Sequence, residues 1–219
     1  MKEFAGMPPS PSLLPQRRML AGMRRQRRHW KSCVLERSAL LIVDMQEYFL
    51  HPDSHAYIPD AAAILPRVRR LLRRFRDHSR PVIFTRFAVA VGEDDPIARW
   101  WGESVAEGAS ESRIISALRP QHGEHTVRKS SYSAFDGTNL EAVLRSRNIR
   151  QIVIAGVCTH LCCDMAAREA FVRGFDVFIA ADATATFSQD LHGAALLSLS
   201  AGVATPVRTA RLLPLLPLA

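Results

Sequence analysis

Short continuous apolar runs that alternate with longer amphipathic segments constrain the fold of this chain more than any other feature. Runs such as SALLIV (38–43) and DVFIAA (176–181) lack polar alternation, which is typical of strands buried on both faces. The segments between them carry apolar residues at helical spacing. This alternation predicts an α/β fold, arranged as a three-layer α/β/α structure with a mainly parallel sheet and Rossmann-like topology.

The expected elements follow from these runs. Strands are expected at residues 38–43, 81–86, 151–157 and 176–181, with a weak strand in 121–128 and an edge strand at 205–209. Helices are expected at residues 60–78, 111–118, 138–147, 161–173 and 190–202. We expect residues 44–49 to form a loop, and residues 88–112, which include Trp100 and Trp101, to be irregular.

The basic charge of the chain is concentrated at its N-terminus. Of the net charge of +8, +7 belongs to residues 1–37 and only +1 to the remainder. We therefore expect residues 1–29 to be a basic, disordered extension and residues 30–219 to form one domain. The arginine cluster at 24–28 could contact nucleic acid, but no aromatic residues are interleaved with it, so we do not expect a nucleic-acid partner. No apolar run reaches the ~20 residues of a membrane span.

The four cysteines do not resemble a disulfide framework. Three of them, Cys158, Cys162 and Cys163, fall within six residues, and Cys33 is far away in the sequence. Reduced thiols in a cytoplasmic protein are the simplest expectation.

Chemically useful side chains follow several of the expected strands. Asp44, Arg86, Lys129 and the turn at 158–162 all lie at such ends. Ligands of parallel sheets bind beyond the carboxyl ends of the strands, so these residues are expected to share one rim. A thiol such as Cys162 in the first turn of a helix experiences a positive field, which is expected to lower its pKa and make it a nucleophile.

Four segments together resemble the isochorismatase-like cysteine hydrolase superfamily over roughly residues 30–210. They are LLIVDMQEYFL around Asp44, RKSSYSAF around Lys129, GVCTHLCC around Cys162, and ADATATFSQDLH at 181–192. The resemblance implies that Cys162 attacks a carbonyl carbon while Asp44 acts as base and then acid, with Lys129 keeping Asp44 ionised. It also implies an oxyanion site at the backbone N–H groups of Cys158 and Cys162, and a cis peptide bond between Val157 and Cys158.

The resemblance further implies a small-molecule substrate, no cofactor, and a homo-oligomer, either a dimer or a tetramer. Expected substrate-binding residues are Gln46, Phe49, Arg86, Trp100, Tyr132, Phe135 and His160. No metal is expected, because the Asp-x-His motif of metal-dependent nicotinamidases is absent from TRFAVAVGEDD (85–95). A zinc site at Cys158, His160 and Cys162 would lack an identified fourth ligand.

Three functional hypotheses remain open from the sequence. The first is hydrolysis of a C–N bond in a small amide, carbamoyl or ureido compound through a thioester on Cys162. Arg86 suggests that this substrate carries a carboxylate. The second is isochorismatase-type hydrolysis of a vinyl ether, with Asp44 as the acid and Cys162 as a bystander. The third is a non-catalytic binding protein whose arginine-rich tail contacts nucleic acid or a protein partner.

Overall fold

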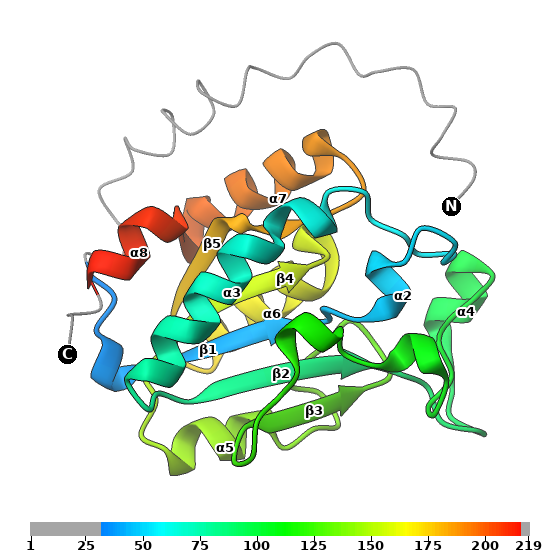
Figure 1. Ribbon diagram of the computed structural model, residues 1–219, viewed down its shortest axis with the longest axis horizontal. Coiled ribbons are helices and arrows are strands. Elements are labelled where there is room, and N and C mark those ends of the chain that lie inside the picture. Colours follow the sequence, from blue (N-terminus) through cyan, green and yellow to red (C-terminus); the bar gives the residue numbers. More distant parts are fainter. Residues whose placement is uncertain (1–31, 216–219) are drawn as a thin grey trace.

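A six-stranded, fully parallel sheet forms the centre of the protein. The structure is a computed structural model, and it describes residues 32–215. The strand order is β3-β2-β1-β4-β5-β6, with every neighbouring pair parallel (Figure 1). The strands are β1 (Ser38–Val43), β2 (Val82–Phe87), β3 (His125–Lys129), β4 (Gln151–Val157), β5 (Asp176–Ala185) and β6 (Ala204–Val207). The predicted three-layer α/β fold is confirmed.

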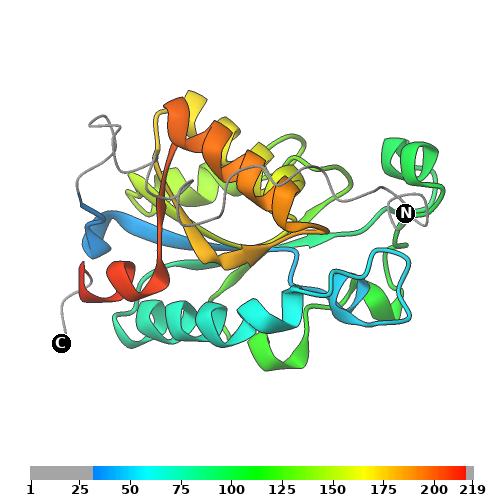
Figure 2. The ribbon, with the colours of Figure 1, turned by 90° about the horizontal axis from the view of Figure 1, so that it is seen from above.

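Helices cover both faces of this sheet. Figure 2 shows α3 (Ala61–Asp77) and α8 (Thr209–Leu215) on one side, and α7 (Gln189–Gly202) on the other. The second side also carries α5 (Leu140–Ser146) and α6 (Asp164–Val172), whose buried residues belong to the same core cluster as those of α7. Two hydrophobic cores result, one on each face of the sheet.

The strands are buried on both faces, as their continuous apolar sequences predict. Along β1, Leu40 and Ile42 join the core beneath α3, whereas Leu41 and Val43 join the core beneath α6. Helix α3 buries one stripe, which includes Val68, and exposes most of its arginines to solvent.

The centre of the sheet is tightly packed where β1 meets β4. Gly156 has φ +119°, and a Cβ built there would lie 2.1 Å from the carbonyl oxygen of Val43. Only glycine fits this close approach of two backbones. The strand order also changes direction between β1 and β4, which is where ligands bind in sheets of this type.

Several predicted elements differ from the structure. Residues 44–49 are not all loop, since α2 begins within them (Glu47–Leu50), and the supposedly irregular 88–112 contains α4 (Pro96–Trp101). The helix predicted at 111–118 is instead two 3₁₀ turns, η3 (Ser110–Ser112) and η4 (Ser116–Leu118). The edge strand ends at Val207 and is followed by α8. A further 3₁₀ turn, η2 (Leu35–Arg37), precedes β1.

The basic extension predicted at residues 1–29 lies outside the described residues. No helix within residues 32–215 is long and apolar enough to span a membrane.

Candidate active site

Three side chains meet at the carboxyl edge of the central strands. Asp44 directly follows β1, Lys129 is the last residue of β3, and Cys162 lies in the π-helix η5 (Thr159–Cys163) that follows β4. All three are buried, with exposed fractions of 0%, 3% and 4%. The sequence placed these residues at one rim, and the structure brings them into contact.

Lys129 contacts both of the other side chains in this cluster. Its Nζ lies 2.8 Å from Oδ2 of Asp44 and 3.3 Å from Sγ of Cys162. It also donates a hydrogen bond to the carbonyl oxygen of Ser131 at 2.9 Å. One ammonium therefore contacts both the carboxylate and the sulfur.

Thr85 holds the Asp44 carboxylate from β2. Its hydroxyl donates to Oδ1 of Asp44 at 2.6 Å and accepts the backbone N–H of the same residue at 3.1 Å. Oδ2 of Asp44 touches Nζ of Lys129, but it accepts no well-directed hydrogen bond from the residues the structure describes. This oxygen is consequently the one available to receive a proton.

Burial, and not the helix terminus, dominates the ionisation of Cys162. Burial raises the pKa of the Cys162 thiol to about 12, with Lys129 opposing this shift and Asp44 adding to it. The expected lowering of this pKa is therefore wrong for the free protein, because α6 begins only at Asp164 and the thiol is shielded from water. Burial alone would lower the pKa of Lys129, but Asp44 and Cys162 outweigh it and raise that pKa.

The turn before Cys162 has the backbone that the resemblance implied. The Val157–Cys158 peptide bond is cis, as predicted. The carbonyl oxygen of Cys158 accepts hydrogen bonds from the N–H groups of Leu161 and Cys163, at 3.2 and 3.1 Å. The N–H groups of Cys158 and Cys162, predicted to hold the oxyanion, take no part in these two bonds.

Two histidines connect this turn (residues 158–162, the cysteine turn) to the end of β5 and to α7. Nδ1 of His160 lies 2.5 Å from Oγ1 of Thr186. Nε2 of His192 lies 3.1 Å from the carbonyl oxygen of Ala181, so it must carry the proton, and Nδ1 then accepts from the Thr159 hydroxyl at 2.9 Å. Burial lowers the pKa of both histidines, which favours these neutral forms.

The cavity above Cys162 is small and largely apolar. Its volume is about 40 Å³. Its lining residues are Tyr48, Phe49, His55, Ala56, Phe87, Ile97, Trp101, Glu103, Tyr132, Cys158, Leu161, Cys162 and Phe187. Aromatic side chains are therefore the largest group among the residues that line the cavity.

Two polar contacts join the segments around the cavity. Nδ1 of His55 lies 3.5 Å from a carboxylate oxygen of Glu103. Nε1 of Trp101 donates a hydrogen bond to the hydroxyl of Tyr132 at 2.6 Å. The loop after α2, the end of α4 and the loop after β3 are thus connected across the cavity.

The predicted substrate-binding residues divide into two groups. Phe49 and Tyr132 line the cavity, and His160 packs edge-on against the lining residue Phe187. The other four predictions, Gln46, Arg86, Trp100 and Phe135, fall on side chains that do not line it.

Each of these four has another role or position. The Gln46 amide is fully used within the fold, because it bonds to both backbone groups of Phe87 and to the carbonyl oxygen of Ser112. Arg86 pairs with Glu107 at 3.1 Å and also donates to Ser112. Trp100 is 78% exposed, so its neighbour Trp101 is the cavity residue. Phe135 is buried in the core beneath α5 and α6.

Sequence reasoning missed Thr85 and most of the cavity. Thr85 carried one detectable signal, since it is the hydroxyl residue of an otherwise apolar run, PVIF, at the end of its strand. Tyr48 and His55 lie in a segment with no clear pattern, and only three-dimensional proximity identifies them.

The cysteines are all free thiols. Cys163 is fully buried and, unlike Cys162, does not line the cavity. Among residues 32–215, no three or more His, Cys, Asp or Glu side chains gather as they would around a metal ion.

Comparison with known proteins identifies the family. The isochorismatase domain model matches residues 38–211. Nicotinamidase 3 of Arabidopsis thaliana is 37% identical over 171 residues, covering 76% of this chain and 82% of the relative. The isochorismatase of Bacillus subtilis is 32% identical over 162 residues, covering 73% of this chain and 52% of the relative.

A solved structure supports the same assignment. The crystal structure of a cysteine hydrolase from Pseudomonas syringae pv. phaseolicola superposes with a TM-score of 0.82 at 25% identity, covering 86% of this chain and 95% of that one. With the family model spanning most of the described residues, the chain belongs to the isochorismatase-like hydrolase family.

Proposed function

We propose that this protein hydrolyses the C–N bond of a small, flat, uncharged carboxamide through a thioester on Cys162. The contact between Lys129, Asp44 and Cys162 beneath a cavity lined by aromatic rings carries this proposal. The buried carboxylate and thiol supply a base and a nucleophile, and the rings suit a flat apolar body.

The chemistry starts from a neutral thiol. Oδ2 of Asp44 takes the thiol proton as Sγ of Cys162 bonds to the amide carbon, and the carbonyl oxygen becomes an oxyanion. The N–H groups of Cys158 and Cys162 are proposed to stabilise that oxyanion. The C–N bond then breaks, and the leaving nitrogen takes the proton from Asp44.

Water completes the cycle. Asp44 removes a proton from a water molecule, whose oxygen attacks the thioester carbon. The C–S bond breaks, the carboxylic acid leaves, and the sulfur regains a proton from Asp44. Lys129 keeps its charge throughout, because its pKa is raised, and its ammonium stabilises the negative charge that moves between oxygen and sulfur.

The cavity favours an uncharged substrate over the carboxylate-bearing one expected from Arg86. Arg86 is paired with Glu107 and is not among the lining residues. The name of the Arabidopsis relative, a nicotinamidase, supports an aromatic primary carboxamide as the first compound to test.

Ammonia release from nicotinamide and benzamide tests the proposal, with N-carbamoyl amino acids as the carboxylate-bearing comparison. We expect turnover of an aromatic amide by wild type and no turnover by Cys162→Ala. Cys163→Ala is the matched control, since this neighbouring buried thiol does not line the cavity, and it should retain activity. Equal activity of Cys162→Ala and Cys163→Ala would refute the covalent route.

Vinyl-ether hydrolysis is the second candidate. Oδ2 of Asp44, which accepts no well-directed hydrogen bond, and the similarity to a Bacillus isochorismatase both favour it. Here Asp44 would protonate the vinyl carbon and Cys162 would be a bystander. Hydrolysis of isochorismate that survives in Cys162→Ala would support this route and exclude the thioester.

Two expectations from the sequence remain predictions. The binding-protein hypothesis depends on residues 1–29, which lie outside the described residues. It predicts salt-sensitive nucleic-acid retention that disappears when these residues are deleted. The expected dimer or tetramer is checked by sedimentation of the full chain.

A further inference from the structure

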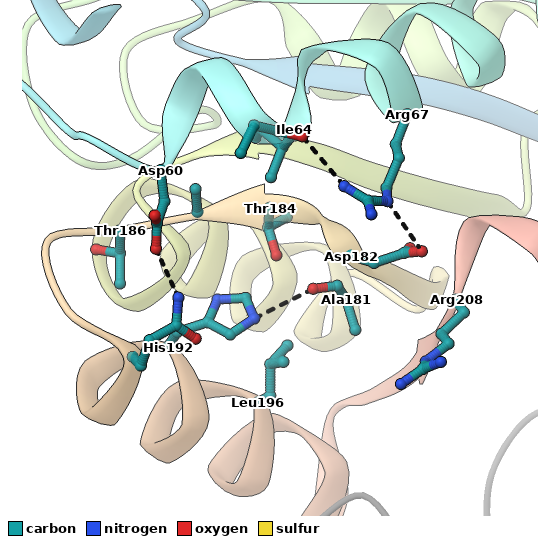
Figure 3. A pocket seen from close by; sticks show the side chains of 13 residues that line it. Asp60, Ile64, Arg67, Ala181, Asp182, Thr184, Thr186, His192, Leu196 and Arg208 are labelled. Carbon is teal, nitrogen blue, oxygen red and sulfur yellow. Dashed lines mark hydrogen bonds and ion pairs between the residues drawn. The ribbon is translucent and has the colours of Figure 1, made fainter. Parts of the chain in front are cut away.

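A second, larger cavity lies beside the end of β5. It has a volume of about 550 Å³, and it opens where β5 continues beyond the last residue of β6, Val207 (Figure 3). Its walls come from α3, α7 and Arg208, and its floor comes from residues 181–186. It shares no lining residue with the cavity above Cys162. Its volume is within the range of about 300–1,000 Å³ that is usual for small-molecule sites.

The floor of this second cavity holds an unsatisfied hydroxyl. Thr184 is 3% exposed, and its Oγ1 has no hydrogen-bond partner among residues 32–215. Figure 3 shows this hydroxyl turned toward the cavity. A buried polar atom without a partner is costly, so it is expected to have a partner when the site is occupied.

The lining carries two carboxylates, Asp60 and Asp182, and two guanidiniums, Arg67 and Arg208, and the exposed guanidinium of Arg208 is the one of these without a protein partner among the described residues. Asp182 accepts two hydrogen bonds from Thr209 and pairs with Arg67 at 3.5 Å. Asp60 accepts a hydrogen bond from Gln189 at 2.5 Å. The guanidinium of Arg208, in contrast, has no hydrogen bond or ion pair within the described part of the chain. An anionic group is the natural partner of this free guanidinium.

The remaining walls are apolar. Ile64 of α3 and Leu196 of α7 lie on opposite sides of the cavity in Figure 3, and Arg208 lies at the end away from Asp60. A ligand with a charged end and a short apolar body would match this arrangement. Phosphate would find only one guanidinium without a protein partner here, and the apolar walls would gain nothing from it.

We propose that this cavity is a binding site for a small organic monocarboxylate. Its carboxylate pairs with Arg208 and accepts the Thr184 hydroxyl proton, and its apolar body packs between Ile64 and Leu196. Binding at this site does not depend on the proposed amide hydrolysis, and a binding measurement tests it without any turnover.

The site also includes the two residues that hydrogen-bond to the cysteine turn. Thr186 and His192 line the cavity, and they hydrogen-bond to His160 and Thr159 of that turn. Carboxylic acids are the product class of amide hydrolysis. On the proposed function, the product therefore belongs to the ligand class that this second cavity accepts.

Benzoate is the probe, and its neutral counterpart benzamide is the comparison. Binding to the full chain is followed by calorimetry and by methyl NMR of Ile64 and Leu196. We expect benzoate to shift both methyl signals and benzamide to leave them in place. Arg208→Gln should weaken benzoate binding at least about tenfold, as for loss of a charge-assisted hydrogen bond. Thr184→Val should weaken it about fivefold, close to the loss of one neutral hydrogen bond.

The controls separate this result from unfolding and from the active site. Arg211→Gln removes an exposed arginine from α8 and should leave benzoate affinity unchanged. Thr184→Val should melt at or above the wild-type temperature, because it removes a buried hydroxyl that has no partner.

Two results would overturn the proposal. One is benzoate binding that is insensitive to Arg208→Gln, or methyl shifts of equal size with benzamide. The other is no benzoate binding by wild type; if Arg208→Gln then also forms a smaller oligomer in sedimentation, the cavity is instead an interface between copies of the chain.

Discussion

Removing either member of the buried Lys129–Asp44 ion pair should lower the free energy of unfolding, because the remaining charge would be buried without its partner. At 2.8 Å and an effective dielectric constant of about 20, their gross attraction is about 6 kcal/mol. Desolvation of two charges offsets most of this gain. Removing one partner, however, leaves the other buried and uncompensated, which costs about 3–5 kcal/mol. Lys129→Met and Asp44→Asn should each lower the free energy of unfolding by this amount.

The double variant distinguishes a coupled pair from two independent residues. Asp44→Asn combined with Lys129→Met leaves no unpaired charge, so its cost should fall short of the sum of the single costs by about 2–3 kcal/mol. The assay is urea unfolding at pH 7.5 and 25 °C, followed by circular dichroism. Additive single costs, or a Lys129→Met variant within about 1 kcal/mol of wild type, would refute the reasoning.

Arg128→Met is the matched control on the same strand. Arg128 pairs with Glu93 at 2.7 Å, but about a third of each side chain is exposed. An ion pair in this setting contributes about 0–1 kcal/mol. Lys129→Met and Arg128→Met change adjacent residues of β3. The first is therefore expected to lower the free energy of unfolding several times more than the second.

The pH dependence of the Lys129 contribution has a definite sign. The folded pKa of Lys129 is raised above the ordinary lysine value of about 10.4. Its stabilisation is therefore complete below that pH and is lost as the pH rises through the folded pKa. The stability difference between wild type and Lys129→Met should be constant from about pH 7 to 9 and shrink only in stronger base.

Three further predictions concern Cys162 and two residues that hydrogen-bond near it, Thr85 and His192. Because burial raises the pKa of the Cys162 thiol to about 12, its alkylation by iodoacetamide should be slow at pH 7.5, and the alkylation rate should rise about tenfold per pH unit. Fast labelling at pH 6.5 in intact-mass measurements would contradict this. Thr85→Val removes the hydrogen bond to Oδ1 of Asp44 and should lower kcat about 10–100-fold with little change in KM, whereas Thr85→Ser should retain most of kcat. His192→Phe removes the acceptor of the Thr159 hydroxyl and should lower both kcat and Tm, with partial recovery in His192→Asn; equal activity of Phe and Asn variants would refute a positioning role.

The three-layer fold, and the edge of the sheet that carries Asp44, Lys129 and Cys162, were predictable from local sequence. Residues 151–157 form a strand with the predicted bounds, because a continuous apolar run ends at a turn and can be buried on both faces. Asp44, Lys129 and Cys162 could be placed at one edge because parallel strands share their carboxyl ends. Such inferences need only the chain near each residue.

Helix α4 shows a local signal that was overlooked. Asp95 caps this helix, accepting the N–H of Ala98 at 2.8 Å, and Pro96 occupies its first turn. An acidic cap followed by proline is a usual helix start. Reading it would have placed Trp100 and Trp101 on a helix, where adjacent residues point in different directions, and only one of them lines the cavity.

The roles of Gln46 and Arg86 could not be read from the sequence. Each resembles a ligand-binding residue until its partners are known, and these partners are distant along the chain. Gln46 bonds to Phe87 and Ser112, whereas Arg86 pairs with Glu107. A polar side chain near an active site contacts substrate only if the fold has not already satisfied it, and that depends on packing between loops.

The small cavity above Cys162 links access, ionisation and selectivity. Its volume of about 40 Å³ is far below the roughly 300–1,000 Å³ that is usual for small-molecule sites. On the proposed function, an amide substrate therefore enters only if the segments joined by the His55–Glu103 and Trp101–Tyr132 contacts separate. While they are joined, the thiol is shielded from solvent and its pKa is high, so it remains neutral. A substrate that enters brings the electrophile to a neutral thiol and keeps water away, so that Asp44 can take the proton as the S–C bond forms. The proposed selectivity for flat apolar amides and the shielding of the thiol thus have one physical cause, the aromatic enclosure of Cys162.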